Sequence, residues 1–328
     1  MGGNQSTQDD VASIRNSKFR IVNLEISNSG DDGLRIDGSE GSIENLTINN
    51  SLDEGLEVNG GYLTLSGLVS INGSGHHGIE LDGGAVIRGG WWNQDEGRPN
   101  YTIQVLNSGD DGIRLRENSV LRLDNFLIEG SADNGLWVTG NSLVTGGWRE
   151  EEDLPDQTIA IRNNGHKGVR LGSGSHCSVD SMLIEGNGNT GLEVAGNSSF
   201  SGGQEQENRD DNPEHMIVIR NNNGPGISLS ELSHLYVENI SINSSSNTGI
   251  SLKEHSTMEM RNSKVESPSS SGIYVSDFSS MEMRDSTVTA KWGISVNDSS
   301  HIGINNSQIT ATHTFSQDDG NQNGSNGI

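Results

Sequence analysis

Apolar residues recur along this chain in pairs that are separated by one residue and preceded by a glycine. Residues 112–115, Gly-Ile-Arg-Leu, show the pattern: glycine, an aliphatic residue, any residue, and a second aliphatic residue. The pattern occurs eleven times, with its glycines at positions 33, 55, 78, 112, 135, 168, 191, 226, 249, 272 and 293. We call these the anchor glycines. Residues two apart share one side of a β-strand, so each copy predicts a short strand with one buried face.

The spacing of the anchor glycines predicts a solenoid. Successive gaps are 22, 23, 34, 23, 33, 23, 35, 23, 23 and 21 residues, so a unit of about 23 residues is lengthened three times. Unit 118–140 contains three alternating runs, at 120–123, 126–128 and 136–138, and no helical stripe. We therefore expect an all-β parallel β-helix of eleven or twelve coils, with three strands per coil and three long loop insertions.

The residues at the turns agree with this architecture. The fifth residue before an anchor glycine is most often Asn or Gly, both of which tolerate the left-handed backbone conformation. These residues are Asn28, Asn50, Gly73, Asn107, Gly130, Asn163, Gly186 and Asn221, followed by Ser244 and Ser267. Asparagines stacked at one position would share hydrogen bonds from coil to coil.

The Asn-x-Gly-x-x-Gly-Ile-x-Leu units resemble the repeats of right-handed parallel β-helix proteins, the pectate-lyase-like superfamily, over residues ~18–311. The resemblance implies a right-handed helix but no single activity, because the superfamily includes lyases, hydrolases, epimerases, phage tailspikes and adhesin shafts. We divide the chain into a tail or cap at 1–14, a β-helix domain at 15–311 and a polar tail or truncated coil at 312–328. The closing Asn326-Gly327-Ile328 looks like an anchor motif cut short, which suggests a fragment or an incomplete last coil.

The charge composition limits the classes of molecule that the protein can bind. The chain has 20 Lys and Arg against 45 Asp and Glu, a net charge of −25. Such a surface repels nucleic acid and anionic lipid, and it disfavours a polyanionic sugar unless a cation such as Ca²⁺ bridges the charges. The single cysteine, Cys177, excludes an internal disulfide, and the sequence contains no apolar run of membrane-spanning length. We expect no nucleic-acid partner, no membrane insertion and no required cofactor.

The three insertions carry the first candidate binding residues. Each leaves the first strand of a coil and returns to the second strand, so all three should emerge at one corner on alternate coils. Trp91, Trp92 and Trp148 lie in the first two insertions, and their flat rings suit stacking on sugars. Covering the underside of the loop is an equally good interpretation for Trp91 and Trp92, and the favoured one for Trp148.

The two residues before each anchor glycine form the second candidate site. Successive coils should stack them in one column, which is ionisable only in the N-terminal half of the chain. The pairs are Asp31-Asp32, Asp53-Glu54, His76-His77, Asp110-Asp111, Asp133-Asn134 and His166-Lys167. Carboxylates one or two coils apart would lie ~5 or ~10 Å apart, close to the separations in retaining and inverting glycosidases. The pairs Asp110-Asp111 and His76-His77 would also suit a divalent cation, while good turn formation alone is the favoured explanation.

The segment Ser-Gly-Asp-Asp-Gly at 29–33 and 108–112 is similar to the Gly-Asp-Asp segment of polygalacturonase-like hydrolases. That resemblance implies catalytic roles for Asp110 and Asp111. The rest of that family's catalytic set is missing, because the preceding coil has Gly-His-His-Gly at 75–78 and the Arg-Ile-Lys segment is absent.

The residue between the two aliphatic positions of each anchor motif should point outward. Along the coils it is Arg35, Glu57, Glu80, Arg114, Trp137, Arg170 and Glu193, then Ser228, Ser251, Tyr274 and Ser295. Alternating Arg and Glu predicts cross-strand ion pairs. Trp137 and Arg114 are also candidate ligand contacts beside the acidic turns.

We therefore expect an extracellular or cell-surface protein that engages a polysaccharide along this face. Trp137, Trp91, Trp92, Trp148, Arg114, His76 and His77 are the expected substrate-binding residues. If the protein is a glycoside hydrolase, Asp110 and Asp111 with Asp133, Asp53 or Glu54 would be its acid and base. The alternative from another class is a non-catalytic adhesin or shaft segment. A bound Ca²⁺ is compatible with both.

Overall fold

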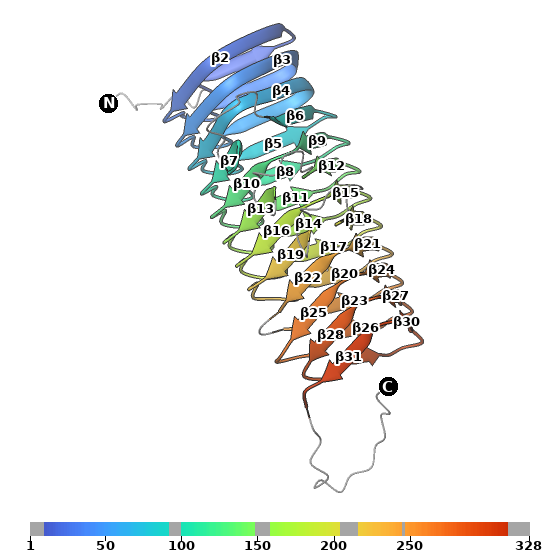
Figure 1. Cartoon of the computed structure of the whole chain (residues 1–328). Coiled ribbons are helices and arrows are strands. Elements are labelled where there is room, and N and C mark those ends of the chain that lie inside the picture. The colour runs from blue at the N-terminus through green and yellow to red at the C-terminus, as the bar shows by residue number, and fades with distance from the viewer. Residues whose placement is uncertain (1–9, 92–99, 148–157, 204–215, 245–246, 314–328) are drawn as a thin grey trace, which may run out of the picture.

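The computed structural model describes residues 10–91, 100–147, 158–203, 216–244 and 247–313. These residues form a straight rod in which the strands pair in parallel with strands of the coils before and after them, and the end strands with one neighbouring coil (Figure 1). No helix occurs among them. One coil visits three faces, which we number in chain order within a coil: face 1, face 2, and face 3, which follows the anchor glycine.

The strands of successive faces run together in the first coils. The strand β2 (Lys18–Ser27) covers faces 1 and 2, whereas β3 (Leu34–Asn49) and β4 (Leu56–Asn72) each cover faces 3, 1 and 2 in turn.

Face 1 continues through β6 (Val86–Trp91), β9 (Val120–Leu123), β12 (Leu143–Gly146), β15 (His176–Val179), β18 (Ser199–Gly202), β21 (His234–Glu238), β24 (Thr257–Arg261), β27 (Ser280–Arg284) and β30 (His301–Asn305). Face 2 continues through β7 (Ile103–Leu106), β10 (Phe126–Glu129), β13 (Ile159–Arg162), β16 (Met182–Glu185), β19 (Ile217–Arg220), β22 (Ile240–Asn243), β25 (Lys264–Ser267), β28 (Thr287–Ala290) and β31 (Gln308–Ala311).

Face 3 has about twelve levels, which confirms the predicted number of coils. Besides β3 and β4 it consists of β1 (Ala12–Arg15), β5 (Ile79–Asp82), β8 (Ile113–Leu115), β11 (Leu136–Val138), β14 (Val169–Leu171), β17 (Leu192–Val194), β20 (Ile227–Leu229), β23 (Ile250–Leu252), β26 (Ile273–Val275) and β29 (Ile294–Val296). The predicted runs of unit 118–140 correspond to β9, β10 and β11.

The three long connections leave face 1 after β6, β12 and β18 and re-enter face 2 at β7, β13 and β19, as the sequence predicts. Most of each insertion, at 92–99, 148–157 and 204–215, lies outside the described residues. Trp92 and Trp148 belong to these segments, and the side chain of Trp91 at the end of β6 is likewise outside the described part.

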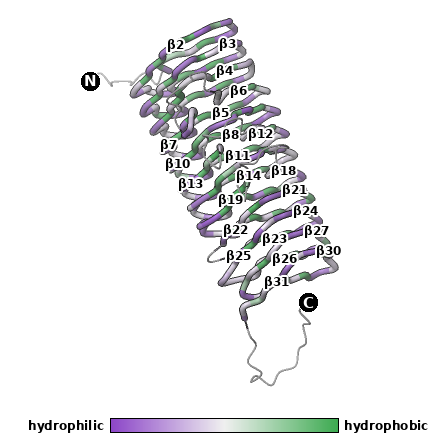
Figure 2. The backbone as a smooth tube through the Cα atoms, in the orientation of Figure 1, coloured by the Kyte–Doolittle hydropathy of each residue, from purple (hydrophilic) through white to green (hydrophobic). Residues whose placement is uncertain are grey.

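The core is one continuous column inside the coils. Inward residues of all three faces pack in it, and Phe126 and Phe200 are the largest fully buried side chains. Hydrophobic and hydrophilic residues alternate along the strands, as expected when one side of each strand faces the column (Figure 2). A chain with only 30% hydrophobic residues can fill this core because the column is narrow.

The turns use the left-handed conformation that the sequence predicts. Asn28, Asn50, Asn107, Asn163 and Asn221 all have φ between 54° and 59°. Side-chain hydrogen bonds at this position are few: Asn50 Nδ2 donates to Asn28 Oδ1 at 3.4 Å, and the intervening glycines interrupt the column.

A continuous amide ladder lies one residue further along, inside the coils. Asn164 Nδ2 donates to Asn187 Oδ1, and Asn187 Nδ2 donates to Asn222 Oδ1, both at 2.9 Å and both buried. The expected stacking of asparagines is therefore strongest at the neighbouring position, where burial leaves the amide groups no water to bond.

A second buried ladder consists of serines at the turn before face 1. The backbone N–H of each serine donates to the hydroxyl oxygen of the serine in the next coil, as from Ser119 to Ser142 and from Ser142 to Ser175 at 3.2 Å each. The same bond continues through Ser198, Ser233, Ser256, Ser279 and Ser300. These bonds satisfy turn N–H groups that neither strands nor water reach.

The described residues contain no helix that is long and apolar enough to span a membrane.

Candidate functional site

The anchor glycines hold the candidate turn residues in register. At Gly78 a Cβ atom would lie 2.2 Å from Val105 Cγ1 of the next coil, so no larger residue fits. The glycine N–H groups bond to the residue before the next anchor: Gly55 to His77 O at 3.0 Å, Gly78 to Asp111 O at 3.2 Å. Each pair of turn residues therefore stacks directly on the pair of the next coil, as the sequence predicts.

The two residues of each pair face different environments. The first members, Asp53, His76, Asp110, Asp133 and His166, are half-exposed, and we call them the outer column. The second members, Asp32, Glu54, His77, Asp111 and Asn134, are buried, and we call them the inner column. Asp110 is 34% exposed whereas Asp111 and His77 are 0% exposed. The sequence pattern treats both members alike and does not predict this division.

Burial decides what each candidate residue can contact. Asp53, Asp110, Asp133 and His76 are accessible to a ligand on the surface. Glu54, Asp111 and His77 act on such a ligand only through a neighbouring group in this conformation.

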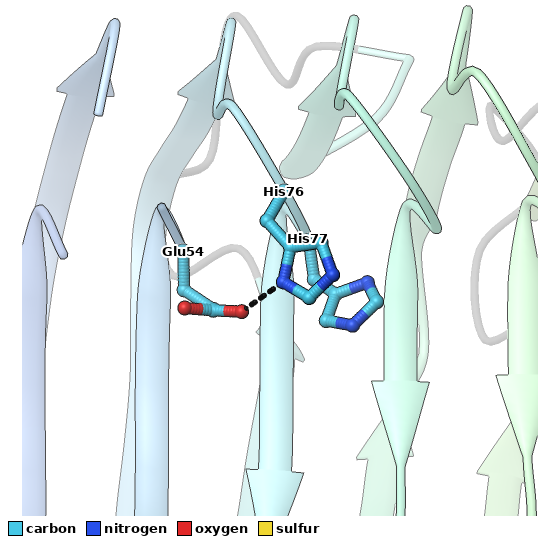
Figure 3. A group of neighbouring side chains, drawn as sticks. All are labelled: Glu54, His76 and His77. Carbon is cyan, nitrogen blue, oxygen red and sulfur yellow. Dashed lines mark hydrogen bonds and ion pairs between the residues drawn. The ribbon is translucent and has the colours of Figure 1, made fainter. Parts of the chain in front are cut away.

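His76 connects the two columns. Its Nδ1 lies 2.6 Å from Glu54 Oε1 (Figure 3). The same nitrogen lies 3.5 Å from Asp53 Oδ1, and Nε2 lies 3.1 Å from Asp110 Oδ2. Burial disfavours the imidazolium, but the hydrogen bond with Glu54 and the Asp110 and Asp53 carboxylates outweigh it and raise the pKa of His76. Burial also raises the pKa of Glu54. His76 thus bridges carboxylates from the coils on both sides.

His77 belongs to a separate buried network. Its Nε2 lies 3.0 Å from Arg114 Nη1, and its Nδ1 lies 3.7 Å from Asp111 Oδ2. Asn134 donates to Asp111 Oδ1 through Nδ2 at 2.8 Å and through its backbone N–H at 3.1 Å. Burial lowers the pKa of His77 to about 3 and raises the pKa of Asp111 to about 6, so a neutral imidazole faces a carboxyl group that ionises only above about pH 6.

The outer column continues with a second histidine. His166 Nδ1 lies 3.2 Å from Asp133 Oδ1, and its Nε2 lies 3.0 Å from Asn189 Nδ2. Asp53, Asp110 and Asp133 thus each have a histidine within ion-pair distance.

The outward residues of face 3 lie beside these turns, and the predicted cross-strand ion pairs are present. Arg35 Nη1 lies 2.6 Å from Glu57 Oε2, and Arg170 Nε lies 3.4 Å from Glu193 Oε1. Lys167 Nζ, from the last ionisable turn, also reaches Glu193 at 2.6 Å.

Trp137 lies between two arginines. The guanidinium carbons of Arg114 and Arg170, from the strands on either side of β11, lie 4.2 and 5.1 Å from its ring centroid. We call these three residues the Arg–Trp–Arg stack. The arginines approach the ring of Trp137 from both neighbouring strands. A ligand would therefore contact the half-exposed Trp137 side chain at its edge, next to the arginine N–H groups, and not across an open ring face.

Among the residues that the structure describes, three groups of side chains have a metal-binding composition. They are Glu54 with His76 and His77, His77 with Asp110 and Asp111, and Asp31 with Asp32 and Asp53, and in each the ligand atoms lie within 4.8 Å of one another. The second group joins His77 to Asp110 and Asp111, which belong to the two turn pairs expected from the sequence to lie side by side.

Asn134, Arg170 and Lys167 are not among the site residues expected from the sequence. Asn134 bonds to Asp111, Arg170 lies over the ring of Trp137, and Lys167 reaches Glu193 beside them. Their positions in the repeat could have identified them. Asn134 and Lys167 directly precede anchor glycines, and Arg170 follows Trp137 in the series of outward residues on face 3.

The match to a family model agrees with this architecture. Residues 157–309 match the family model described as right-handed beta helix region. Among solved structures, the A-module of the mannuronan C-5 epimerase AlgE4 from Azotobacter vinelandii is similar, with 12% sequence identity and a TM-score of 0.39 over 93% of this chain and 90% of that chain. No curated protein sequence matches the chain.

Proposed function

Since the chain is a right-handed parallel β-helix protein, we propose that it binds a linear polysaccharide along the turns before the anchor glycines and the adjoining strands of face 3. The observation that carries this proposal is the alignment of the outer column with the Arg–Trp–Arg stack on the same few coils. Both run along the rod axis, so they present a strip that suits an extended polymer better than a compact ligand.

The strip offers the groups that sugars need. Asp53, Asp110 and Asp133 are half-exposed acceptors for sugar hydroxyls, and the guanidinium groups of Arg114 and Arg170 are donors. The edge of Trp137 supplies apolar contact area between these donors. The insertions that carry Trp91, Trp92 and Trp148 join face 1 to face 2, whereas the strip runs along the turns between faces 2 and 3, so sugar contacts by these tryptophans are a separate prediction. A polysaccharide of this kind implies an extracellular or cell-surface location.

Glycoside hydrolysis is a second candidate function, and one observation favours it. Asp110 and Asp133 lie on adjacent coils, stacked at about 5 Å, which resembles the carboxyl separation of retaining glycosidases. In the hydrolase function, Asp110 and Asp133 serve as nucleophile and acid. The buried Asp111 acts indirectly through Asn134, which donates hydrogen bonds to both Asp111 and Asp133.

A glycan array followed by calorimetry on the bound polysaccharide tests the proposal. We expect Trp137→Ala and Arg170→Ala each to weaken binding by about 10-fold, the loss of roughly 1.4 kcal/mol for one stacked or charge-assisted contact. Tyr274→Ala is the matched control, because Tyr274 occupies the same outward position in β26, beyond the ionisable turns.

Three outcomes separate the alternatives. Binding that depends on Trp137 but releases no reducing ends or unsaturated products supports a binding protein. Turnover that Asp133→Asn abolishes supports the hydrolase. Recognition of a protein instead of any glycan would favour the adhesin or shaft alternative and reject the proposal.

A further inference from the structure

Two buried polar atoms face each other without a hydrogen bond. His77 Nδ1 and Asp111 Oδ2 lie 3.7 Å apart on side chains that are both 0% exposed. Within the part of the chain that the structure describes, neither atom has a hydrogen-bond partner. Leaving a buried polar atom unpaired costs about 1–3 kcal/mol, so two such atoms facing each other call for an explanation.

The separation of His77 Nδ1 and Asp111 Oδ2 is too long for a direct hydrogen bond and too short for a bridging water molecule. At 3.7 Å the two atoms are farther apart than the roughly 3.2 Å limit of a good N–H···O bond. They are closer than a bridging water requires, since two hydrogen bonds of about 2.8 Å that meet at a tetrahedral angle span about 4.5 Å. Two atoms bound to one metal ion at ~2.1 Å in tetrahedral geometry lie ~3.4 Å apart, which is close to the spacing observed.

The surroundings fix the direction of both groups. Asn134 donates twice to Asp111 Oδ1, which turns Oδ2 toward His77. The ring of His77 lies on the side of its turn away from Glu54, beside the next coil (Figure 3). Asp110 completes a group in which one ligand atom from each of the three side chains, His77, Asp110 and Asp111, lies within 4.8 Å of the others. The half-exposed Asp110 carboxylate gives the site an opening to the surface.

We propose that His77 Nδ1, Asp111 and Asp110 bind a divalent transition-metal ion of the Zn²⁺ or Co²⁺ type. The imidazole nitrogen favours these ions over Ca²⁺, which prefers six to eight oxygen donors. Three protein donors leave a coordination position free toward the exposed side of Asp110. The proposal is independent of polysaccharide binding.

Metal binding would also change the Arg–Trp–Arg stack. A metal ion on Nδ1 leaves the ring proton on Nε2, which then faces Arg114 Nη1 at 3.0 Å, donor against donor. Arg114 must therefore move, and its guanidinium carbon lies 4.2 Å from the Trp137 ring centroid. Tryptophan emission should report the occupancy of the site.

The experiment titrates the whole chain, freed of metal with a chelator, with Zn²⁺, Co²⁺ and Ca²⁺ by calorimetry, and measures bound metal by mass spectrometry. We expect one Zn²⁺ or Co²⁺ ion per chain, no displacement by millimolar Ca²⁺, and a change in tryptophan emission that Trp137→Phe removes while metal binding persists. Asp110→Asn and Asp111→Asn should weaken binding more than the roughly 10-fold to 100-fold loss that an outer-shell change causes.

His234→Gln is the control for the loss of a histidine, since His234 is exposed on face 1 and bonds to Thr257. Asp110→Asn alters a half-exposed side chain and keeps the test valid if Asp111→Asn unfolds the protein. Absence of Zn²⁺ and Co²⁺ binding, equal affinity in Asp110→Asn, or preferential Ca²⁺ binding would overturn the proposal.

Discussion

At the scale of residues, the main result is that neighbours in sequence have opposite environments. Asp110 is accessible and contacts His76, whereas Asp111 is enclosed between His77 and Asn134. The same contrast holds for Asp53 and Glu54. Two acidic residues that look equivalent in a motif are therefore suited to different tasks: one to meet a ligand, the other to hold a neighbour or a metal ion.

A second acidic pair, Asp32 and Glu57, lies nearer the N-terminus. Burial, followed by a hydrogen bond with Asp32, raises the pKa of Glu57 from 4.5 to about 7, and the nearby Arg35 opposes this rise without cancelling it. Burial likewise raises the pKa of Asp32 to about 6. Because the folded state holds the Glu57 proton more tightly than the unfolded chain does, this contribution to stability is complete below pH 4.5 and is lost as the pH rises through about 7.

Replacing Glu57 by Gln should flatten the pH dependence of stability. The wild-type free energy of unfolding should fall between pH 4.5 and 7, by at most about 1.4 kcal/mol per pH unit from this group. In Glu57→Gln the remaining fall should come from the other buried carboxyl groups whose pKa is raised, namely Asp32, Asp111 and Glu54. Urea unfolding at several pH values measures the slope, and an unchanged slope would contradict the assignment.

At the scale of elements, each coil depends on glycine where the chain enters face 3. At Gly168 glycine is required because a side chain would clash, and not because of the backbone conformation. An added Cβ would lie 2.3 Å from Ile184 Cγ2 and 2.7 Å from Gly191 O. Four residues later, at Gly172, an added Cβ would meet nothing within 4 Å. The repeat pattern identifies the first glycine as essential, and the structure supplies the reason.

The substitution Gly168→Ala should destabilise the protein by about 2 kcal/mol or more, because the backbone of the next coil cannot move away from the new methyl group. Gly172→Ala is the matched control and should change stability by no more than about 0.5 kcal/mol. Thermal or urea unfolding followed by circular dichroism gives both values. Equal effects of the two substitutions would show that close packing of coils at the anchor is not what requires glycine.

At the scale of the whole molecule, the rod is a stack in which each coil contacts mainly its neighbours. Consecutive coils are interchangeable where their sequences agree: β24 and β27 both carry Met-Glu-Met-Arg, and Met258 pairs with Met281 and Met260 with Met283. Stability in such an array is approximately a sum over coils and their interfaces.

Deleting residues 255–277, a full coil of 23 residues, should therefore leave a folded β-helix. The strand β21 would then pair with β27 instead of β24, with methionines in the same inward positions. We expect a β-type circular dichroism spectrum and one cooperative unfolding transition. Deleting residues 255–266 only, which removes half a coil and shifts the faces, should lose this transition. Similar behaviour of both deletions would contradict the model of independent coils.

Much of this architecture follows from the sequence by itself. The period of the anchor glycines, the alternation of apolar residues and the turn asparagines determine the number of coils, the three faces and the order of the candidate residues along the rod, because a solenoid repeats one local geometry. Even the outward series on face 3, from Arg35 to Glu193, follows from that period.

Only the tertiary structure decided which members of the turn pairs are buried, because that depends on the depth of each side chain beneath the strands of the next coil. It placed Trp137 between Arg114 and Arg170, joined His76 to carboxylates of two other coils, and set the unpaired atoms of His77 and Asp111 against each other. These are contacts between residues more than 20 positions apart, and their distances depend on the stacking of coils, which a linear pattern does not contain.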